Sequence, residues 1–276
     1  MESSERNIID GRPEMNSFLK KNLWKLLLLF ALIAFVIMPF VRTGYVIRFL
    51  TTMFMFAALS QVWGILGGFA GYISLGISGF VGVGAYGTGI LMNMGFSFYT
   101  AVLLVSVFAS VLSVFIGMVV LRLRAGYYSI ATFAIALILR DLSNNWTWLT
   151  GGGIGLSLPF LDLGIDGMNT YFYFCMLIIL IGVTLLCVIF SKSSLGFGLM
   201  AIKEDEDAAS VLGINTTVFK AIGFVMSAFI AALIGGTYAY WFTFIEPYCA
   251  RQHNDSRFIR QNKDEYDAGN ISVPFR

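Results

Sequence analysis

Long uncharged stretches alternate with short charged segments along this chain. No Asp, Glu, Lys or Arg occurs from Phe49 to Leu121, and shorter uncharged stretches cover Leu26–Phe40, Gly167–Ser191 and Ala221–Ile245. A membrane-spanning helix needs about 20 predominantly apolar residues, because the hydrocarbon core is roughly 30 Å thick and a helix rises about 1.5 Å per residue. The longest stretch therefore has room for three crossings. No water-soluble architecture requires such a run.

We expect an all-α fold, namely a polytopic transmembrane helical bundle of about seven spans with a glycine-rich segment that is either broken or closely packed. The spans are predicted at residues 23–41, 49–66, 77–93, 99–121, 127–145, 171–190 and 219–243. The predicted organisation is a cytoplasmic N-terminal leader over 1–22, a transmembrane domain over 23–247 with a cytoplasmic loop at 191–218, and a polar tail over 248–276. The first span is expected to remain uncleaved, since no small-residue cleavage site follows it.

The basic residues orient these spans. Cytoplasmic loops of membrane proteins are enriched in Lys and Arg, and the leader is basic, so the N-terminus is predicted inside. Since each predicted span changes the side of the membrane, Arg122, Arg124, Lys192, Lys203 and Lys220 then also lie inside. The loop from Trp146 to Thr170 lies outside and lacks Lys and Arg. Up to the seventh span only Arg42 and Arg48 fall on the opposite side, but seven crossings would also leave the basic residues of the tail outside.

Composition narrows the functional classes. Of the 276 residues, 58% are hydrophobic and 12% charged, against roughly half and a quarter in soluble domains. A net charge of +2 argues against a nucleic-acid partner. Three cysteines exclude a disulfide framework. With one histidine, His253, the chain has no recognisable nucleophile–base–acid set, and we expect no enzymatic activity.

Glycines are dense between Gly64 and Gly95, and two interpretations are compatible. One is close helix packing, for which Gly64/Gly68 and Gly67/Gly71 have the spacing of GxxxG pairs. The other is a broken or re-entrant helix that lines a path, since irregular backbone at membrane depth occurs only where protein or a cavity surrounds it.

Two loops stand out. The segment Trp146–Pro159, WTWLTGGGIGLSLP, is predicted to form a structured external loop. It lacks the Lys of a phosphate-binding P-loop. The segment Ser194–Lys220 predicts a short amphipathic helix with Ile202, Ala209 and Leu212 at helical spacing and Gly213 as its stop. Its four consecutive acids point in different directions without a supporting His, so a metal site is not expected. A solvated charged face and a helix that docks a cytoplasmic partner both remain open.

Three separated segments resemble permease subunits of branched-chain amino-acid ABC importers of the LivM type. The family's glycine-rich block is resembled by GGFAGYISLGISGFVGVGAYGTG. A second block of the family is resembled by LRLRAGYYSIATFAIALILRDLSNNWTWLTGGGIGLS. The cytoplasmic signature that contacts the ATPase is resembled by GFGLMAIKEDEDAASVLGIN. The blocks occur in family order over about residues 45–245. Departures are Tyr72, Ile77 and Asp207, where the family often has Gln, His and Glu.

The resemblance implies a permease that translocates branched-chain, hydrophobic amino acids across the bacterial inner membrane. Its implied partners are two cytoplasmic ABC ATPases, a second permease, an extracytoplasmic amino-acid-binding protein and the lipid bilayer. It implies no cofactor, because ATP is bound by the partner subunits. The implied ATPase-docking residues are Gly198, Ala201, Glu204, Glu206, Asp207, Ala208, Ala209 and Gly213. The translocation-path candidates are Gly71, Ser74, Gly76, Ser78, Gly82, Gly84 and Tyr86, with Ser74 and Ser78 serving the zwitterion.

Three further expectations stay open. After Pro247 the family would continue into further spans, whereas this sequence becomes polar, so we expect a truncated or altered end. Within the class, the substrate could instead be urea or a short amide. From other classes, an ion-coupled secondary transporter would want an intramembrane ionisable group, for which Arg140 and Asp141 are candidates, and a purely structural membrane subunit would need none.

Overall fold

A computed structural model describes residues 34–39, 44–152, 155–159 and 164–245. The predicted leader, most of the predicted first span and the tail after Ile245 lie outside these residues. The elements are α2 Tyr45–Gly67, α3 Ile77–Asn93, α4 Phe98–Val120, α5 Ala125–Asn145, α6 Thr147–Thr150, β1 Leu156–Ser157, α7 Gly164–Ser191, α8 Ser194–Glu204, α9 Glu206–Val211, α10 Thr216–Phe242 and β2 Phe244–Ile245.

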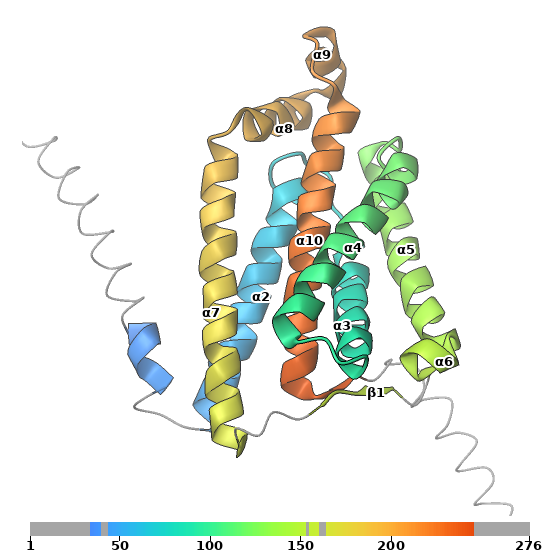
Figure 1. Ribbon diagram of the computed structural model, residues 1–276. Coiled ribbons are helices and arrows are strands. Elements are labelled where there is room, and N and C mark those ends of the chain that lie inside the picture. Colours follow the sequence, from blue (N-terminus) through green and yellow to red (C-terminus); the bar gives the residue numbers. More distant parts are fainter. Residues whose placement is uncertain (1–33, 40–43, 153–154, 160–163, 246–276) are drawn as a thin grey trace, which may run out of the picture.

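The long helices form one bundle (Figure 1). Helices α8 and α9 lie at one end, called the α9 end below, and α6 with the two short strands lies at the opposite end, called the strand end. Among the described residues, four helices are long and apolar enough to cross a membrane, namely α2, α4, α7 from Asp166, and α10. The expectation of an all-α membrane bundle is therefore confirmed.

The seven-span count is not established. Helices α3 and α5 form where spans were predicted, but α3 has only 17 residues and α5 ends in the polar sequence Arg140–Asn145. The predicted first span is described only over residues 34–39, which are helical.

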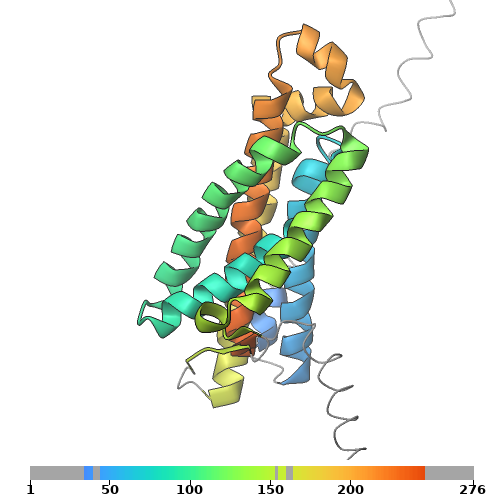
Figure 2. The same cartoon turned by 90° about the vertical axis from the view of Figure 1, so that its right-hand side faces the viewer.

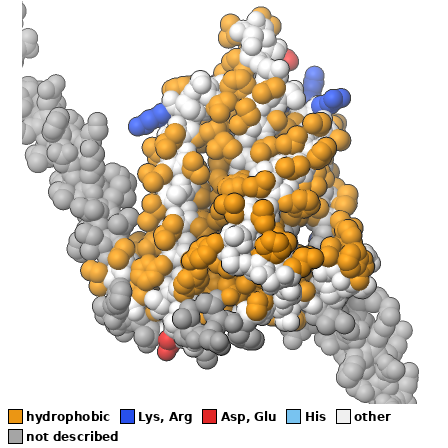
Figure 3. Space-filling view, viewed as in Figure 1, with side chains coloured by type: hydrophobic (Ala, Val, Ile, Leu, Met, Phe, Trp, Pro, Cys, Tyr) orange, Lys and Arg blue, Asp and Glu red, His pale blue; other side chains and the backbone are white. Residues whose placement is uncertain are grey.

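The outer surface of the bundle is apolar. Helix α4 exposes Val107, Phe108, Val111, Phe115 and Val119, which recur every three or four residues and so cover one face. In Figure 3 hydrophobic side chains cover the middle of the molecule, and Lys and Arg side chains lie near the α9 end. A helix that is apolar towards both the core and the surroundings suits a lipid environment.

Helix α10 is the centre of the bundle, and small residues let α3 approach it closely. A Cβ at Gly84 would lie 2.6 Å from the Cα of Ala232, and a Cβ at Gly235 would lie 2.9 Å from the Cα of Val81. The glycine-rich segment is thus closely packed on its α10 side. The two GxxxG pairs singled out from the sequence are not the contact, because a Cβ at Gly64 would meet nothing within 4 Å and one at Gly67 only Trp63.

The same segment is also broken. Residues 68–76 are not helical, and their backbone is satisfied by hydroxyls of α5. Ser129 Oγ donates to the carbonyl of Ile73 at 2.8 Å, and the amide of Leu75 donates to Thr132 Oγ1 at 3.2 Å. Side chains of α5 therefore satisfy two backbone groups that no helix satisfies here, as irregular backbone at membrane depth requires.

The predicted external loop is structured. Leu156–Ser157 pairs in an antiparallel manner with Phe244–Ile245, which ties the loop to the end of α10. Thr150 Oγ1 donates to the carbonyls of Ser143 and Trp146 at 2.6 and 2.8 Å and so fixes the turn between α5 and α6.

A polar contact at the strand end accounts for Arg48, one of the two exceptions to the charge pattern. Arg48 Nε donates to Asn169 Oδ1 at 3.2 Å, and Trp241 Nε1 donates to the same oxygen at 3.2 Å. Asn169 is buried. These bonds join α2, α7 and α10 and give the buried amide its partners.

We expect Gly84→Ala to lower the melting temperature of the detergent-solubilised chain, because a methyl group there meets the α10 backbone. Overpacking of this kind costs about 1–3 kcal/mol. Gly82→Ala is the matched control on the same helix, since a Cβ there meets nothing within 4 Å and Ala is favoured over Gly in helices by about 1 kcal/mol. Thermal unfolding followed by tryptophan fluorescence checks this, and equal melting temperatures for the two variants would contradict the close α3–α10 contact.

Candidate functional site

The predicted single docking helix is two helices. Asp205 adopts an extended conformation between α8 and α9, and α8 lies across the ends of the long helices while α9 projects furthest from the bundle in both views (Figures 1 and 2). The sequence-based expectation of one continuous amphipathic helix was wrong. The physical reason is Asp205, whose carboxylate accepts hydrogen bonds from the amides of Asp207 and Ala208 at 2.9 and 3.0 Å and so caps a new helix.

The predicted stop at Gly213 is confirmed. Gly213 has φ +86°, its amide donates to the carbonyl of Ser210, and the amide of Ile214 donates to the carbonyl of Ala209. This pair of bonds is a Schellman motif, which favours glycine at this position. Helix α9 is therefore closed by side chain at its start and by backbone at its end.

The apolar residues of this unit separate into two groups. Ile202 and Ala209 are buried, as their spacing predicts, but Leu212 is 80% exposed and Val211 is 86% exposed. The expectation that Leu212 shares the buried face was wrong, because the helix ends at Val211. Val211 and Leu212 instead form an exposed apolar tip on the element furthest from the bundle.

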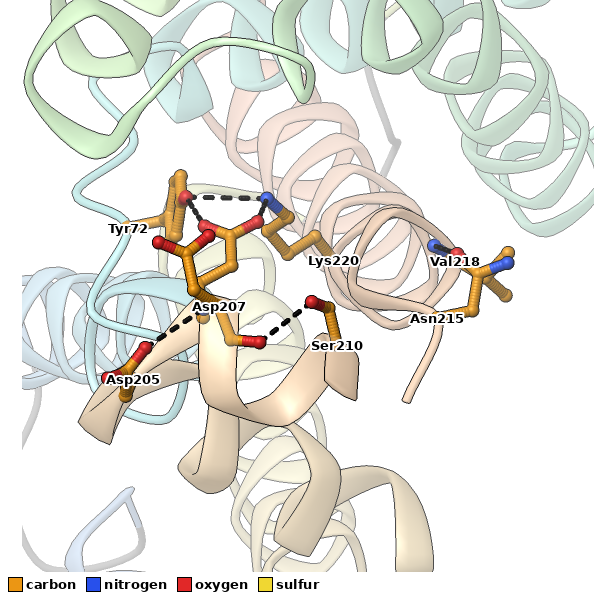
Figure 4. A network of polar contacts seen from close by, with 8 residues as sticks. Tyr72, Asp205, Asp207, Ser210, Asn215, Val218 and Lys220 are labelled. Atoms are coloured by element: carbon orange, nitrogen blue, oxygen red, sulfur yellow. Dashed lines mark hydrogen bonds and ion pairs between the residues drawn. The ribbon is translucent and has the colours of Figure 1, made fainter. Parts of the chain in front are cut away.

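A buried charge holds α9 to the bundle. Lys220, near the start of α10, is only 2% exposed, and its Nζ lies 2.6 Å from Glu206 Oε1 of α9. The same Nζ donates to Tyr72 Oη at 3.3 Å and lies 4.5 Å from the centre of the Tyr72 ring. Tyr72 Oη in turn donates to Glu206 Oε2. These three residues, called the Lys220 cluster below, join α9, α10 and the 68–76 segment (Figure 4).

The electrostatics of the Lys220 cluster favour the ionised carboxylate. Partial burial of Glu206 raises the pKa of its carboxyl, but the hydrogen bonds from Lys220 and Tyr72 and the positive charge of Lys220 outweigh that effect, so the pKa lies below its ordinary value of 4.5. Burial, then the hydrogen bond to Glu206 and its charge, raise the pKa of the Tyr72 hydroxyl. At neutral pH Glu206 is therefore a carboxylate and Tyr72 a neutral phenol.

A cleft of about 580 Å³ opens beside the Lys220 cluster. Arg122, Arg124 and Lys203 line it together with the cluster. Among the described residues these three cations have no ion-pair partner. Gly71 also lies here, where its missing side chain leaves room for the stem of Lys203.

The other predicted docking residues lie in or next to this unit. Gly198 packs under the ring of Phe219, with the ring Cζ 3.2 Å from where a Cβ would be. Ala201 is half-buried in α8, while Glu204, Asp207 and Ala208 are exposed. The structure thus brings the predicted docking set together on one projecting unit. Its role in docking stays a prediction.

The path candidates do not form one site. Ser78, Gly82 and Tyr86 line a cavity of about 360 Å³ between α3 and α5. Gly84 faces α10 instead, and Gly71 belongs to the cleft at the α9 end. Ser74 and Gly76 lie buried in the non-helical 68–76 segment.

Three charged or polar groups of these sites were not singled out as site residues from the sequence. Tyr72 entered only as a departure from the family, and Lys220 only as one of the inside positive charges. Arg140, which lines the α3–α5 cavity, entered as a candidate ion-coupling group. For Lys220 the available signal was a single charge within the otherwise apolar α10, which by default marks a functional or structural polar contact.

We expect Glu206→Gln to accelerate amide hydrogen exchange in residues 194–214, because it leaves the Lys220 ammonium buried without a counter-charge. An unsatisfied buried polar group costs about 1–3 kcal/mol, and more when charged. Lys220→Met should cost less, since it frees a partly exposed carboxylate, and the double variant should cost less than the sum. Asp207→Asn, an exposed neighbouring acid, is the control. Additive effects of the two cluster variants would contradict the ion pair.

The pH dependence follows from the lowered pKa of Glu206. A depressed carboxyl pKa contributes stability that is fully present above the unfolded value of about 4.5 and is lost as the pH falls through the folded value. Exchange protection of α9, corrected for the intrinsic rate, should be constant from pH 8 to 5 and fall below about pH 4.5. Glu206→Gln should remove this step, and an unchanged step in that variant would assign it to another group.

Comparisons with known proteins agree with the resemblance noted in the sequence. The family described as "Branched-chain amino acid transport system / permease component" matches residues 45–255. The high-affinity branched-chain amino acid transport system permease proteins LivM of Salmonella typhimurium strain LT2 and Escherichia coli strain K12 are each 30% identical over 250 residues, covering 81% of this chain and 59% of the relative. The chain therefore spans about three fifths of the length of the curated relatives it matches. No solved structure matches the chain.

The matched residues include every described helix from α2 to α10. The family is one of transport permeases and not a class of enzymes. Taken with the apolar bundle, the match shows that this chain belongs to the family of permease components of branched-chain amino acid transport systems.

Proposed function

We propose that the chain is a membrane-spanning permease subunit of an ATP-driven importer that translocates branched-chain amino acids across a bacterial plasma membrane. The observation that supports this most is the α8–α9 unit. In a chain of this family it projects an exposed apolar tip from the bundle while a buried ion pair anchors it to the central helix. A purely structural membrane subunit has no need of such an anchored projection.

The orientation proposed is that the α9 end faces the cytoplasm. Arg122, Arg124, Lys192 and Lys203 belong to the turns and helices of that end, and cytoplasmic loops are enriched in Lys and Arg. Helix α2 then runs from outside to inside, so a preceding span at 23–41 would leave the N-terminus in the cytoplasm. Seven crossings, counting α3 and α5, agree with this arrangement.

The proposed partners are two cytoplasmic ABC ATPases, a second permease subunit and an extracytoplasmic amino-acid-binding protein. ATP is bound by the ATPases, so the chain itself needs no cofactor. Closure of the ATPases displaces α9, and the Lys220 cluster passes that displacement to α10 and to the 68–76 segment. The contacts that support this route are the Glu206–Lys220 ion pair and the Tyr72–Glu206 hydrogen bond.

Reconstitution tests the proposed function. The full-length chain is placed in vesicles with its candidate ATPases, second permease and binding protein, and uptake of radiolabelled leucine is measured. The proposal requires uptake that depends on ATP and is competed by isoleucine and valine. Competition by urea or acetamide in place of these amino acids would overturn the substrate. Uptake driven by an ion gradient without ATP would overturn the class of transporter.

We expect Val211→Asp with Leu212→Asp to abolish co-purification of the ATPase, since the two side chains are 86% and 80% exposed and apolar, and burying an uncompensated charge in an interface costs several kcal/mol. Ser194→Asp is the control, because it adds a negative charge to an exposed position at the start of α8, where an acid is tolerated. Gly213→Ala should weaken association by straining the turn. Unchanged co-purification of the double variant would rule out docking through this tip.

A further inference from the structure

A cavity lies between α3 and α5, and nearly all of its lining residues come from these two helices. It encloses about 360 Å³, near the lower end of the roughly 300–1,000 Å³ typical of small-molecule sites. Figure 2 shows α3 and α5 from the α5 side of the bundle. The lining residues are Ser78, Gly79, Gly82, Val83, Ala85, Tyr86, Phe133, Ala136, Leu137, Leu139, Arg140, Ser143 and Ile245.

The wall formed by α5 changes from apolar to polar along its length. Phe133, Leu137, Arg140 and Ser143 all line the cavity, and their spacing of three and four residues places them on one helix face. The aromatic and aliphatic residues come first, and the guanidinium and hydroxyl follow towards the strand end. The cavity is thus apolar in its interior and polar at one end.

The wall formed by α3 adds a polar group at that same level. A Cβ at Gly79 would lie 3.1 Å from the Cα of Ala136, and α3 and α5 both run from the α9 end to the strand end. Seven residues further along each helix, Tyr86 is therefore level with Ser143. The buried Tyr86 hydroxyl has no hydrogen-bond partner among the described residues. The Ser143 hydroxyl donates to the Leu139 carbonyl at 3.0 Å, which leaves its lone pairs available as acceptors.

Arg140 is the only charged residue among the described residues that line the cavity. Its ion pair with Asp141 is long, at 3.4 Å, and the two side chains are 44% and 61% exposed. An exposed pair of this kind holds its partners weakly, so the guanidinium remains available to another anion. Charged side chains in membrane helices are costly unless they face a cavity or a partner, and this cavity supplies such a setting.

We propose that the α3–α5 cavity binds a single zwitterionic amino acid with an apolar side chain, and that Arg140 binds its α-carboxylate. The ammonium group donates to the hydroxyl oxygen of Ser143, and the side chain lies against Val83, Phe133 and Leu137. The assignment of the ligand class rests on the proposed transport function. It moves the polar end of the path away from Ser74, which is buried in the 68–76 segment.

Gly82 sets the space available to the ligand side chain. It lines the cavity, and a Cβ at this position would meet nothing within 4 Å. A larger residue here would fill the cavity without disturbing a protein contact. Gly84, two residues on, offers the contrast, because its Cβ would meet the α10 backbone.

Protection from alkylation tests the carboxylate contact without requiring transport. Leu137→Cys is introduced into the full chain with its native cysteines replaced by alanine, and maleimide labelling is timed in nanodiscs. Leucine should slow labelling, while leucinamide, which lacks the carboxylate, should not. Arg140→Gln should raise the leucine concentration needed about 10- to 100-fold, the loss expected for a charge-assisted hydrogen bond. Asp141→Asn, which alters the neighbouring charge outside the cavity lining, should leave protection intact.

Gly82→Val tests the location of the side chain. Protection by leucine should be lost while protection by alanine is retained, and the melting temperature should not fall. Equal protection by leucine and leucinamide, or an unchanged response in Arg140→Gln, would overturn the site. If ATP drives leucine uptake and Arg140→Gln takes up leucine as well as the unmodified chain, the site is overturned and the transport function is retained. Protection without any uptake in the reconstituted system would overturn the transport function and leave the binding site.

Discussion

The burial of Lys220 constrains the arrangement of the whole α9 end. An ammonium that is 2% exposed is stable there only if a counter-charge and hydrogen bonds replace its water. Glu206 and Tyr72 supply them, and they come from a projecting helix and from a non-helical segment. The requirement to satisfy one charge therefore joins two elements, α9 and the 68–76 segment, that lie far apart in the sequence. Without it, α9 would be attached to the bundle mainly through Ala209 and the turns on either side.

Close packing on one side of α3 determines where open space can exist. Gly84 and Gly235 bring the backbones of α3 and α10 together, so a path cannot run between these two helices. On the opposite side α5 packs closely on α3 along a stripe of Thr132, Ala136 and Leu139, against Gly76 and Gly79. Beyond that stripe the helices leave the α3–α5 cavity. The dense glycines thus serve packing on one face and space on the other, and both interpretations of the sequence describe part of the segment.

The sequence was sufficient for features that depend on local chemistry. The apolar stretches predicted α2, α3, α4, α5 and α10 to within about four residues, and α7 except for its start at Gly164, seven residues before the predicted one, because apolar length and turn residues determine where such helices begin and end. The stop at Gly213 followed from its backbone freedom. The break at Asp205 was missed because an acid at a helix start and an acid within a first turn look alike in sequence. The partners of Lys220 were not predictable, since Glu206 and Tyr72 belong to other elements.

The α8–α9 unit and the α3–α5 cavity are linked through the 68–76 segment. Tyr72 contacts Glu206 at the α9 end, and the next residues, Ile73 and Leu75, are hydrogen-bonded to Ser129 and Thr132 of α5. Phe133, the first α5 residue of the cavity lining, directly follows Thr132. A displacement of α9 that moves Glu206 therefore reaches α5 through the hydrogen bonds of Ile73 and Leu75 with Ser129 and Thr132. The segment that carries these bonds is not helical, so it has no helical hydrogen bonds to resist the displacement. Because α10 and α3 are locked together by backbone contact, α5 is the wall of the cavity that can move. Helix α5 thus connects the segment that contacts Lys220 at the α9 end to the guanidinium of Arg140 near the strand end.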